Sequence, residues 1–202
     1  PLHLVAHSMG GHIGLRYLAE HPGAIRRAVL LAPMLGIRTG GIPIPVARQL
    51  ARWMTGRGRG GDFALTQKPH GAQALSPVRQ AALTGDNERF ADEIWWVERN
   101  PALALGGVTW GWLDAAFQSL DRLAAPGYLQ RVETPVLMLM PENEQVVDPA
   151  AARRAAARLP HCLLKVVPGG RHELLRDVDA VRNAALAEIR AALDGTEGQA
   201  RG

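Results

Sequence analysis

The sequence contains a single cysteine, Cys162, which excludes an internal disulfide framework and any metal site built from several cysteines. Cys162 stands just before an apolar run, so we expect it to pack in the core, and a reducing compartment is compatible with it. Lysine is scarce as well, because 21 of the 23 basic residues are arginines. They are scattered among acidic residues, so the net charge of +4 indicates a polar surface and no nucleic-acid partner.

Long hydrophobic runs are also absent. The most apolar stretch, residues 28–35, is interrupted by Pro33 and falls far short of the ~20 residues that a membrane-spanning helix needs. A chain of 202 residues with 47% hydrophobic and 21% charged residues is typical of a globular protein with one sizeable core. We expect a cytoplasmic or membrane-peripheral protein. Because the chain begins at Pro1 inside an apolar segment, we also expect native sequence upstream of it.

Short apolar runs alternate with helical patterns at both ends of the chain. The runs that predict strands are residues 2–6, 28–32, 135–140 and 163–167. The helical patterns cover residues 9–20, 149–159 and 178–193. This alternation predicts an α/β protein with a parallel sheet covered by helices on both faces. The outer edge of the first strand would be left apolar and unpaired.

The middle of the chain has a different character. Residues 35–130 show no strand alternation, include the glycine- and arginine-rich stretch 57–61, and hold every tryptophan and phenylalanine. We expect a helical cap or lid insertion with its own small aromatic core. The α/β core would then consist of residues 1–34 and 131–194, and the polar tail 195–202 would be disordered.

Ser8 lies where the first strand turns sharply into a helix, within residues 6–11 (AHSMGG). A serine on such a strained turn has its hydroxyl exposed above the sheet, as a nucleophile requires, and the turn needs small neighbours such as Ala6 and Gly10. The N–H of Met9, at the start of the helix, would be free to donate to an oxyanion. A serine at such a junction also serves as a simple helix cap, and the small residues are what favour the nucleophile.

A serine hydroxyl needs a base, and several histidines are candidates for this role. His172 lies in residues 168–172 (PGGRH), directly after the last predicted strand, where open α/β sheets place their ligand sites. The alternatives are His7, His12, His70 and His161. The position of His172 after a core strand favours it as the general base.

The third member of a serine–histidine–acid triad would orient the imidazole. Residues 141–148 (PENEQVVD) follow the third predicted strand and contain Glu142, Glu144 and Asp148. All three lie between the serine and the histidine in the chain, which is the order found in α/β-hydrolases. The residues alone do not decide among them.

These motifs together resemble the α/β-hydrolase superfamily, and within it the bacterial lysophospholipase and monoacylglycerol-lipase group of serine aminopeptidase S33-type hydrolases. The resemblance rests on residues 6–11, 144–147 (EQVV) and 168–173 (PGGRHE), and in the insertion on residues 83–90, 100–101 and 106–112. It implies the C-terminal part of the fold, with the N-terminal strands and the second oxyanion donor absent from this chain. It also implies that Glu144 is the triad acid, with Asp148 as the second choice.

The resemblance further implies a serine hydrolase that cleaves carboxylic esters through an acyl-enzyme formed on Ser8, with His172 as base and the Met9 N–H in the oxyanion hole. Lysophospholipid or monoacylglycerol would be the substrate, with a peripheral membrane contact and without metal or organic cofactor. Two alternatives stay open. One is another activity on the same scaffold, as a peptidase, thioesterase or carbon–carbon bond hydrolase, and the other is a non-catalytic binding protein. The sequence does not indicate an oligomeric state.

Overall fold

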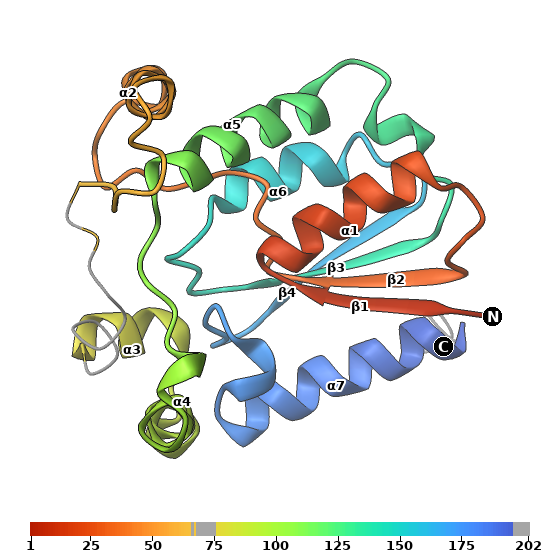
Figure 1. The fold of residues 1–202 in the computed structure, drawn as a ribbon. Helices are drawn as coiled ribbons and strands as arrows, with labels where there is room; N and C mark the ends of the chain where they lie inside the picture. Colours follow the sequence, from red (N-terminus) through yellow and green to blue (C-terminus); the bar gives the residue numbers. More distant parts are fainter. Residues whose placement is uncertain (66, 68–75, 196–202) are drawn as a thin grey trace.

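The core of the computed structural model is a four-stranded sheet in which all neighbouring strands are parallel, in the order β1-β2-β3-β4 (Figure 1). The structure describes residues 1–65, 67 and 76–195. The strands are β1 (His3–His7), β2 (Arg27–Leu31), β3 (Val136–Pro141) and β4 (Cys162–Val167). The predicted parallel sheet is therefore confirmed. Within the described residues β1 and β4 lie at its edges, and β2 and β3 are the buried centre.

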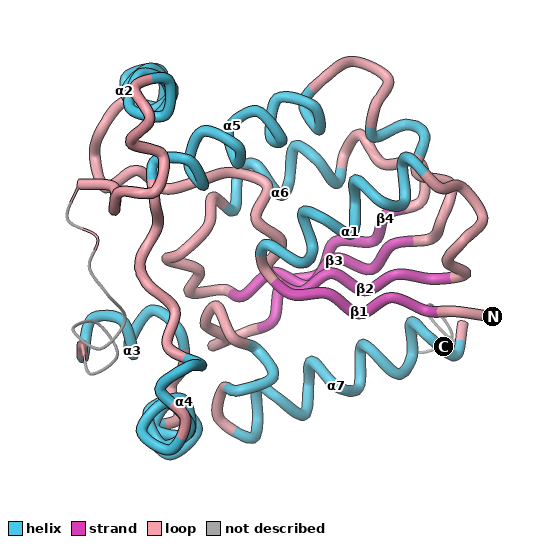
Figure 2. The backbone as a smooth tube through the Cα atoms, viewed as in Figure 1, coloured by secondary structure: helices cyan, strands magenta, loops and turns pink. Residues whose placement is uncertain are grey.

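Helices cover both faces of this sheet (Figure 2). They are α1 (Met9–Glu20) and α6 (Pro149–Ala156) on one face, and α7 (Asp179–Asp194) on the other. Because successive strand residues point to opposite faces, Leu30 packs under α1 and α6, whereas Val29 and Leu31 pack against α7. None of the described helices is long and apolar enough to cross a membrane.

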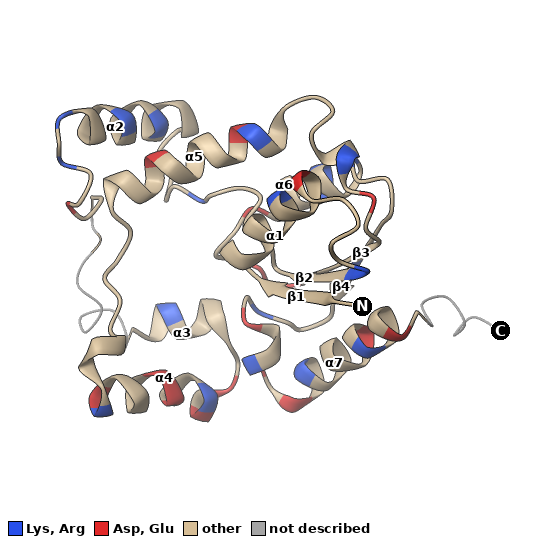
Figure 3. Cartoon of the chain, turned by 45° about the vertical axis from the view of Figure 1, so that its right-hand side comes forward, with Lys and Arg blue, Asp and Glu red and all other residues tan. Residues whose placement is uncertain are grey.

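Residues 35–130, which we call the cap, contribute helices at the carboxyl ends of the strands (Figure 1). The cap helices are α2 (Ile44–Gly56), α3 (Pro77–Leu83), α4 (Asn87–Arg99), the short η2 (Pro101–Leu103) and α5 (Trp110–Ala124). The remaining short helices are η3 (Leu129–Arg131) and η4 (Leu174–Arg176). Basic and acidic residues both occur along α4, α5 and α7 (Figure 3). His70 and the tail residues 196–202 lie outside the described residues.

The small core that we expect in the cap holds two of its aromatic rings among the described residues. The cluster between α2 and α5 contains Trp110 and Phe117, but its other buried members are Ala47, Ala51, Met54 and Ala64. Small residues let the two helices approach closely, which leaves no room there for further rings. The other rings of the cap lie elsewhere, and Trp53, Phe63, Trp95 and Trp96 are exposed. These exposed rings are surface features that composition alone could not place.

Helix α1 lies unusually close to the segment that follows β2. A Cβ atom added at Gly11 would stand 2.8 Å from the Cβ atom of Pro33 and 3.2 Å from its Cα atom, whereas one added at Gly10 would meet only Ala6 at 3.9 Å. Close approach to a rigid proline therefore requires glycine at position 11.

We expect Gly11→Ala to lower the free energy of unfolding by about 1–3 kcal/mol, because the added methyl group overpacks the contact with Pro33. Gly10→Ala is the matched control one residue away, and it should leave stability unchanged or slightly raised. Urea unfolding of the purified variants measures both changes. Equal stability of the two variants would contradict the packing argument.

His12 fastens α1 to the cap helix α5. Its Nδ1 lies 3.1 Å from the carbonyl oxygen of Met34, and its Nε2 lies 2.6 Å from Ser119 Oγ. Because a carbonyl only accepts, Nδ1 donates, and the neutral ring accepts the Ser119 hydroxyl at Nε2. Burial lowers the pKa of His12 and Arg16 lowers it further, against a hydrogen bond to Met34 that raises it. The folded state thus holds this imidazole neutral.

Because the pKa of His12 is lower in the folded chain, the unfolded chain binds the proton more readily. Its contribution to stability is complete above the ordinary pKa of 6.5 and is lost as the pH falls below that value. We expect His12→Gln to have a lower free energy of unfolding than wild type at pH 8. Between pH 6.5 and 5 its free energy of unfolding should fall less steeply with pH than that of wild type, and the two slopes should differ by at most about 1.4 kcal/mol per pH unit. His161→Gln, at an exposed position, is the control. Parallel stability curves for wild type and His12→Gln would refute the assignment.

Candidate active site

Ser8 occupies a strained turn between β1 and α1. Its backbone angles are φ 52° and ψ −118°, a left-handed conformation that costs a non-glycine residue about 1–3 kcal/mol. Neighbouring backbone groups hold the turn, because the Ser8 N–H donates to Leu31 O at 2.9 Å and the Ser8 carbonyl accepts the N–H of Met34 at 2.9 Å. The junction therefore projects the Ser8 side chain beyond the carboxyl end of β1.

The serine hydroxyl contacts the histidine that follows β4. His172 Nε2 lies 3.0 Å from Ser8 Oγ, and His172 Nδ1 lies 3.0 and 2.9 Å from the two carboxylate oxygens of Glu144. An ionised carboxylate only accepts, so Nδ1 carries the proton and Nε2 is free to accept from the serine. Three loops that are far apart in the sequence thus meet at the carboxyl ends of the parallel strands.

The structure separates the three candidate carboxylates. Glu144 is buried against His172, while exposed Glu142 accepts the Gly169 N–H at 2.7 Å. Asp148 is the N-cap of α6, where Oδ1 accepts the Ala150 N–H at 2.9 Å and Oδ2 pairs with Arg154. Asp148 thus caps the first turn of α6, whereas Glu144 contacts the imidazole of His172.

Glu144 is ionised despite its burial. Burial alone would raise the pKa of this carboxyl group, but hydrogen bonds from His172 and from the N–H groups of Val147 and Val146 lower it on balance. These N–H groups donate to Oε1 at 3.0 and 2.7 Å. The loop after β3 therefore supplies its own donors for the charge that it buries.

The other histidines take different positions. His7 Nε2 donates to the carbonyl oxygen of His172 at 3.0 Å, and the two rings lie 4.8 Å apart. Desolvation lowers the pKa of His7, and so does the nearby His172. His12 binds Ser119, as described above, and His161 is exposed just before β4. His7 therefore holds the backbone of the His172 loop through this hydrogen bond.

Sequence patterns did not reveal how the His172 loop is attached to the cap. The Glu173 N–H donates to Leu83 O at 2.9 Å. Buried Asp177 accepts the N–H groups of Arg171 and Gly85, both at 2.8 Å. An aspartate shortly after a histidine motif is too common a pattern to have signalled this role. These bonds join the His172 loop to the segment at the end of α3.

The Met9 N–H is available at the first turn of α1. Within the described residues it donates to no acceptor, whereas the following Gly11 and His12 N–H groups both reach Ser8 O. The start of a helix carries partial positive charge. An anionic oxygen held beside Ser8 would meet this donor.

An apolar cavity of about 510 Å³ opens above Ser8. Its walls come mainly from the cap, and they include Ile37, Leu50, Ala64, Trp110, Trp112, Leu113, Phe117 and Val147. This volume is in the range of small-molecule binding sites. Of Ser8, His172 and Glu144, Ser8 alone is among the residues that line it. The site therefore combines a serine hydroxyl hydrogen-bonded to an imidazole with a largely apolar cavity.

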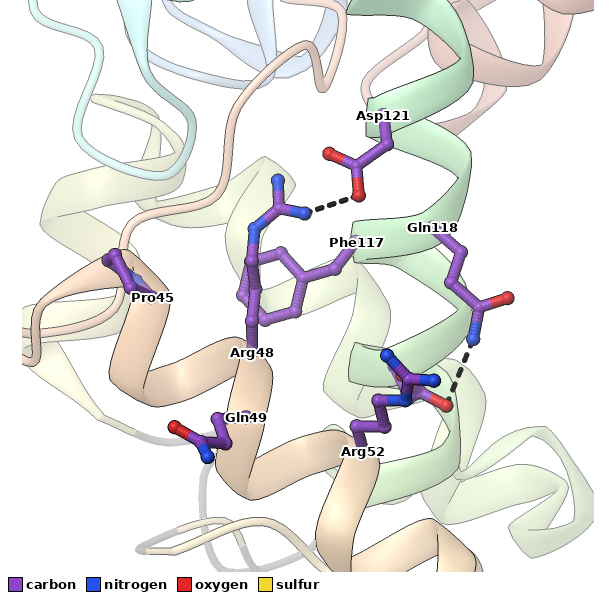
Figure 4. Close-up of a pocket in the computed structure, with 8 residues that line it drawn as sticks. Pro45, Arg48, Gln49, Arg52, Phe117, Gln118 and Asp121 are labelled. Atoms are coloured by element: carbon purple, nitrogen blue, oxygen red, sulfur yellow. Dashed lines mark hydrogen bonds and ion pairs between the residues drawn. The ribbon is translucent and has the colours of Figure 1, made fainter.

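A second hollow, of about 690 Å³, lies on the outer side of the α2–α5 pair (Figure 4). There Arg48 crosses the ring of Phe117 and binds Asp121 at 2.5 Å, and Gln118 donates to Asp114 at 3.0 Å. No residue of the Ser8 cluster lines it. In the described part of the chain, no group of three or more histidine, cysteine, aspartate or glutamate side chains is arranged to hold a metal ion.

Comparison with known proteins places this geometry in a family. Residues 1–179 match the family described as serine aminopeptidase, S33. The probable lysophospholipase L2 of Haemophilus influenzae is 31% identical over 192 residues, covering 93% of this chain and 58% of that protein. Lysophospholipase L2 of Escherichia coli K12 is 30% identical over 201 residues, covering 93% and 56%. The chain thus spans less than two thirds of the length of these relatives.

Solved structures show the same fold. A soluble variant of monoglyceride lipase from Saccharomyces cerevisiae, in complex with a substrate analogue, has a TM-score of 0.73 at 19% identity, covering 96% of this chain and 62% of that one. Monoacylglycerol lipase from Paleococcus ferrophilus has a TM-score of 0.70 at 21% identity, covering 95% and 68%. The chain belongs to the serine aminopeptidase S33 family.

Proposed function

We propose that the Ser8 cluster is the active site of a serine hydrolase that cleaves carboxylic esters through an acyl-enzyme. The observation that carries this proposal is the chain of contacts from Glu144 through His172 to Ser8, on a strained turn at the mouth of an apolar cavity. In this proposal Ser8 is the nucleophile, His172 the general base and Glu144 the triad acid.

The reaction follows from the proton positions. His172 Nε2 removes the proton from Ser8 Oγ as that oxygen bonds to the ester carbon, and the Met9 N–H donates to the oxyanion. When the carbon–oxygen bond to the alcohol breaks, His172 returns the proton to the departing oxygen. A water molecule, deprotonated by the same nitrogen, then releases the acid. Glu144 stays ionised throughout, because its lowered pKa lets it stabilise the charged imidazole without taking its proton.

The substrate that this site suits best is a lysophospholipid or a monoacylglycerol. An acyl chain fits the apolar cavity above Ser8. The names of the relatives agree with it, since two are lysophospholipases L2 and two similar folds are monoglyceride or monoacylglycerol lipases.

The family description favours a peptidase as the second candidate. The same triad cleaves amides, so the two functions differ only in the group that the cap accepts. Parallel assays with monoacylglycerol, lysophospholipid and aminoacyl p-nitroanilides separate them. Faster turnover of the anilides than of the two lipids would favour the peptidase over the ester hydrolase.

A fluorophosphonate probe should label the wild-type protein, measured in its longest native form, and should fail to label Ser8→Ala and His172→Ala. Both variants should lose at least about 10⁴-fold in ester hydrolysis, because the triad acts as a unit. Ser119→Ala is the matched control, since Ser119 also bonds to a histidine Nε2 but lies away from the strained turn. Retained labelling in Ser8→Ala would remove Ser8 from the mechanism.

The triad acid can be tested by two isosteric changes. Glu144→Gln should lower kcat by about 10³- to 10⁴-fold, because an amide no longer selects the required tautomer or stabilises the imidazolium. Asp148→Asn should keep activity within about threefold, because asparagine also caps a helix. If Asp148→Asn proves the more damaging variant in esterase kinetics, the acid has been misassigned.

A further inference from the structure

The peptide group that follows His172 is bonded to two distant parts of the chain. Its oxygen accepts a hydrogen bond from His7 Nε2, at the end of β1, at 3.0 Å. Its nitrogen, which belongs to Glu173, donates to the carbonyl oxygen of Leu83 at the end of α3, at 2.9 Å. The backbone of the imidazole-bearing residue is therefore held between the strand that precedes Ser8 and the cap.

Asp177 extends this attachment to the residue that precedes His172. Its side chain is buried, with 1% of the residue exposed, and Oδ2 accepts the Arg171 N–H at 2.8 Å. Oδ1 accepts the N–H of Gly85, in the turn between α3 and α4, at 2.8 Å. A buried carboxylate is unfavourable without such donors. One side chain thus holds the His172 loop and the turn of the cap against each other.

The turn of the cap approaches Asp177 so closely that it needs glycine. A Cβ atom added at Gly85 would lie 3.0 Å from Asp177 Oδ1 and 3.1 Å from Arg171 Nη1. The Arg171 guanidinium is itself held, because Nη1 donates to the carbonyl oxygen of Thr84 at 2.8 Å. A methyl group at position 85 would therefore push against side chains that fix the His172 loop.

We infer that Asp177 is a positioning residue, which keeps the His172 imidazole aligned with Ser8 by fixing the loop backbone to the cap at Gly85. This inference rests on the proposed function, in which His172 is the general base, and it adds a residue to that function. The imidazole lies 3.0 Å from Ser8 Oγ and 2.9 Å from a Glu144 oxygen, so a shift of its backbone changes both contacts. A displacement of about 1 Å near reacting groups can lower a rate by about 100-fold.

Asp177→Asn and Gly85→Ala test the two sides of this contact. The first turns amide hydrogens toward a backbone N–H, and the second crowds the carboxylate. We expect kcat to fall by about 10- to 100-fold for Asp177→Asn and by about 3- to 30-fold for Gly85→Ala. KM should stay within about twofold of wild type, because neither residue lines the cavity above Ser8. Fluorophosphonate titration counts the active sites, so that kcat is expressed per reactive serine.

The matched controls are an exposed carboxylate and a second cap glycine. Asp179 lies two residues after Asp177 and is exposed, and a Cβ atom added at Gly56 would meet no atom within 4 Å. Asp179→Asn and Gly56→Ala should keep kcat within about twofold of wild type.

The double variant Asp177→Asn/Gly85→Ala should lose no more than about twofold beyond Asp177→Asn alone, because both changes disturb the same contact. Losses that multiply would overturn the coupling between the loop and the cap. A smaller number of active sites with unchanged kcat per site would also overturn the inference and leave Asp177 a structural role.

The proton on His172 Nδ1 gives a readout that needs no turnover. Because it is bonded to the buried Glu144 carboxylate, it should give a downfield proton NMR signal, which Glu144→Gln identifies by removing it. We expect this signal to shift or broaden in Asp177→Asn and in Gly85→Ala, and to stay unchanged in the two controls. An unchanged signal in both test variants would contradict the positioning role.

Failure of the proposed function is recognised separately. The wild-type protein would then cleave no ester and take up no fluorophosphonate, and the NMR comparison alone would decide whether Asp177 positions the imidazole.

Discussion

The burial of the Glu144 carboxylate is the constraint on which the rest of the site depends. A buried ionised group is costly unless hydrogen bonds satisfy it. Here two backbone N–H groups of its own loop and the imidazole of His172 do so. The hydrogen bond from His172 to Glu144 places the proton on Nδ1, and Nε2 then faces Ser8 as an acceptor. The contact between Glu144 and His172 thus links the shape of the loop after β3 to the orientation of the imidazole toward Ser8.

The cap is more than a cover over this cluster. Its bonds to the α/β core include those between His12 and Ser119 on α5 and between Glu173 and Leu83 at the end of α3. The cap helices then have different surfaces. The α2–α5 pair is closely packed on small residues and faces Ser8 with apolar side chains, whereas α4 presents charges and exposed tryptophan rings. This division places a largely apolar cavity, which Ser8 lines, next to a hollow with charged side chains.

Much of the core was predictable because local patterns and tertiary packing agree there. Short apolar runs predicted all four strands, and the change to a helical period after Ser8 predicted α1. The cap was harder. Its helices were expected only as a class, and composition does not tell which of its aromatic rings face protein and which, such as those at positions 95 and 96, face water. The attachment by Asp177 gave no local signal at all.

The sequence by itself determined the architecture and two of the three side chains in the Ser8 cluster, because a strained strand-to-helix turn and a glycine-bounded histidine loop are local features. Only the tertiary structure distinguished Glu144 from Glu142 and Asp148. All three are acidic residues of one loop, and they differ in their hydrogen-bond partners. Glu144 contacts the imidazole of His172, Glu142 accepts a backbone N–H from the loop after β4, and Asp148 caps the first turn of α6. The partners of Glu144 and Glu142 lie in the loop after β4, so the three acidic residues become distinguishable only when β3 and β4 are paired.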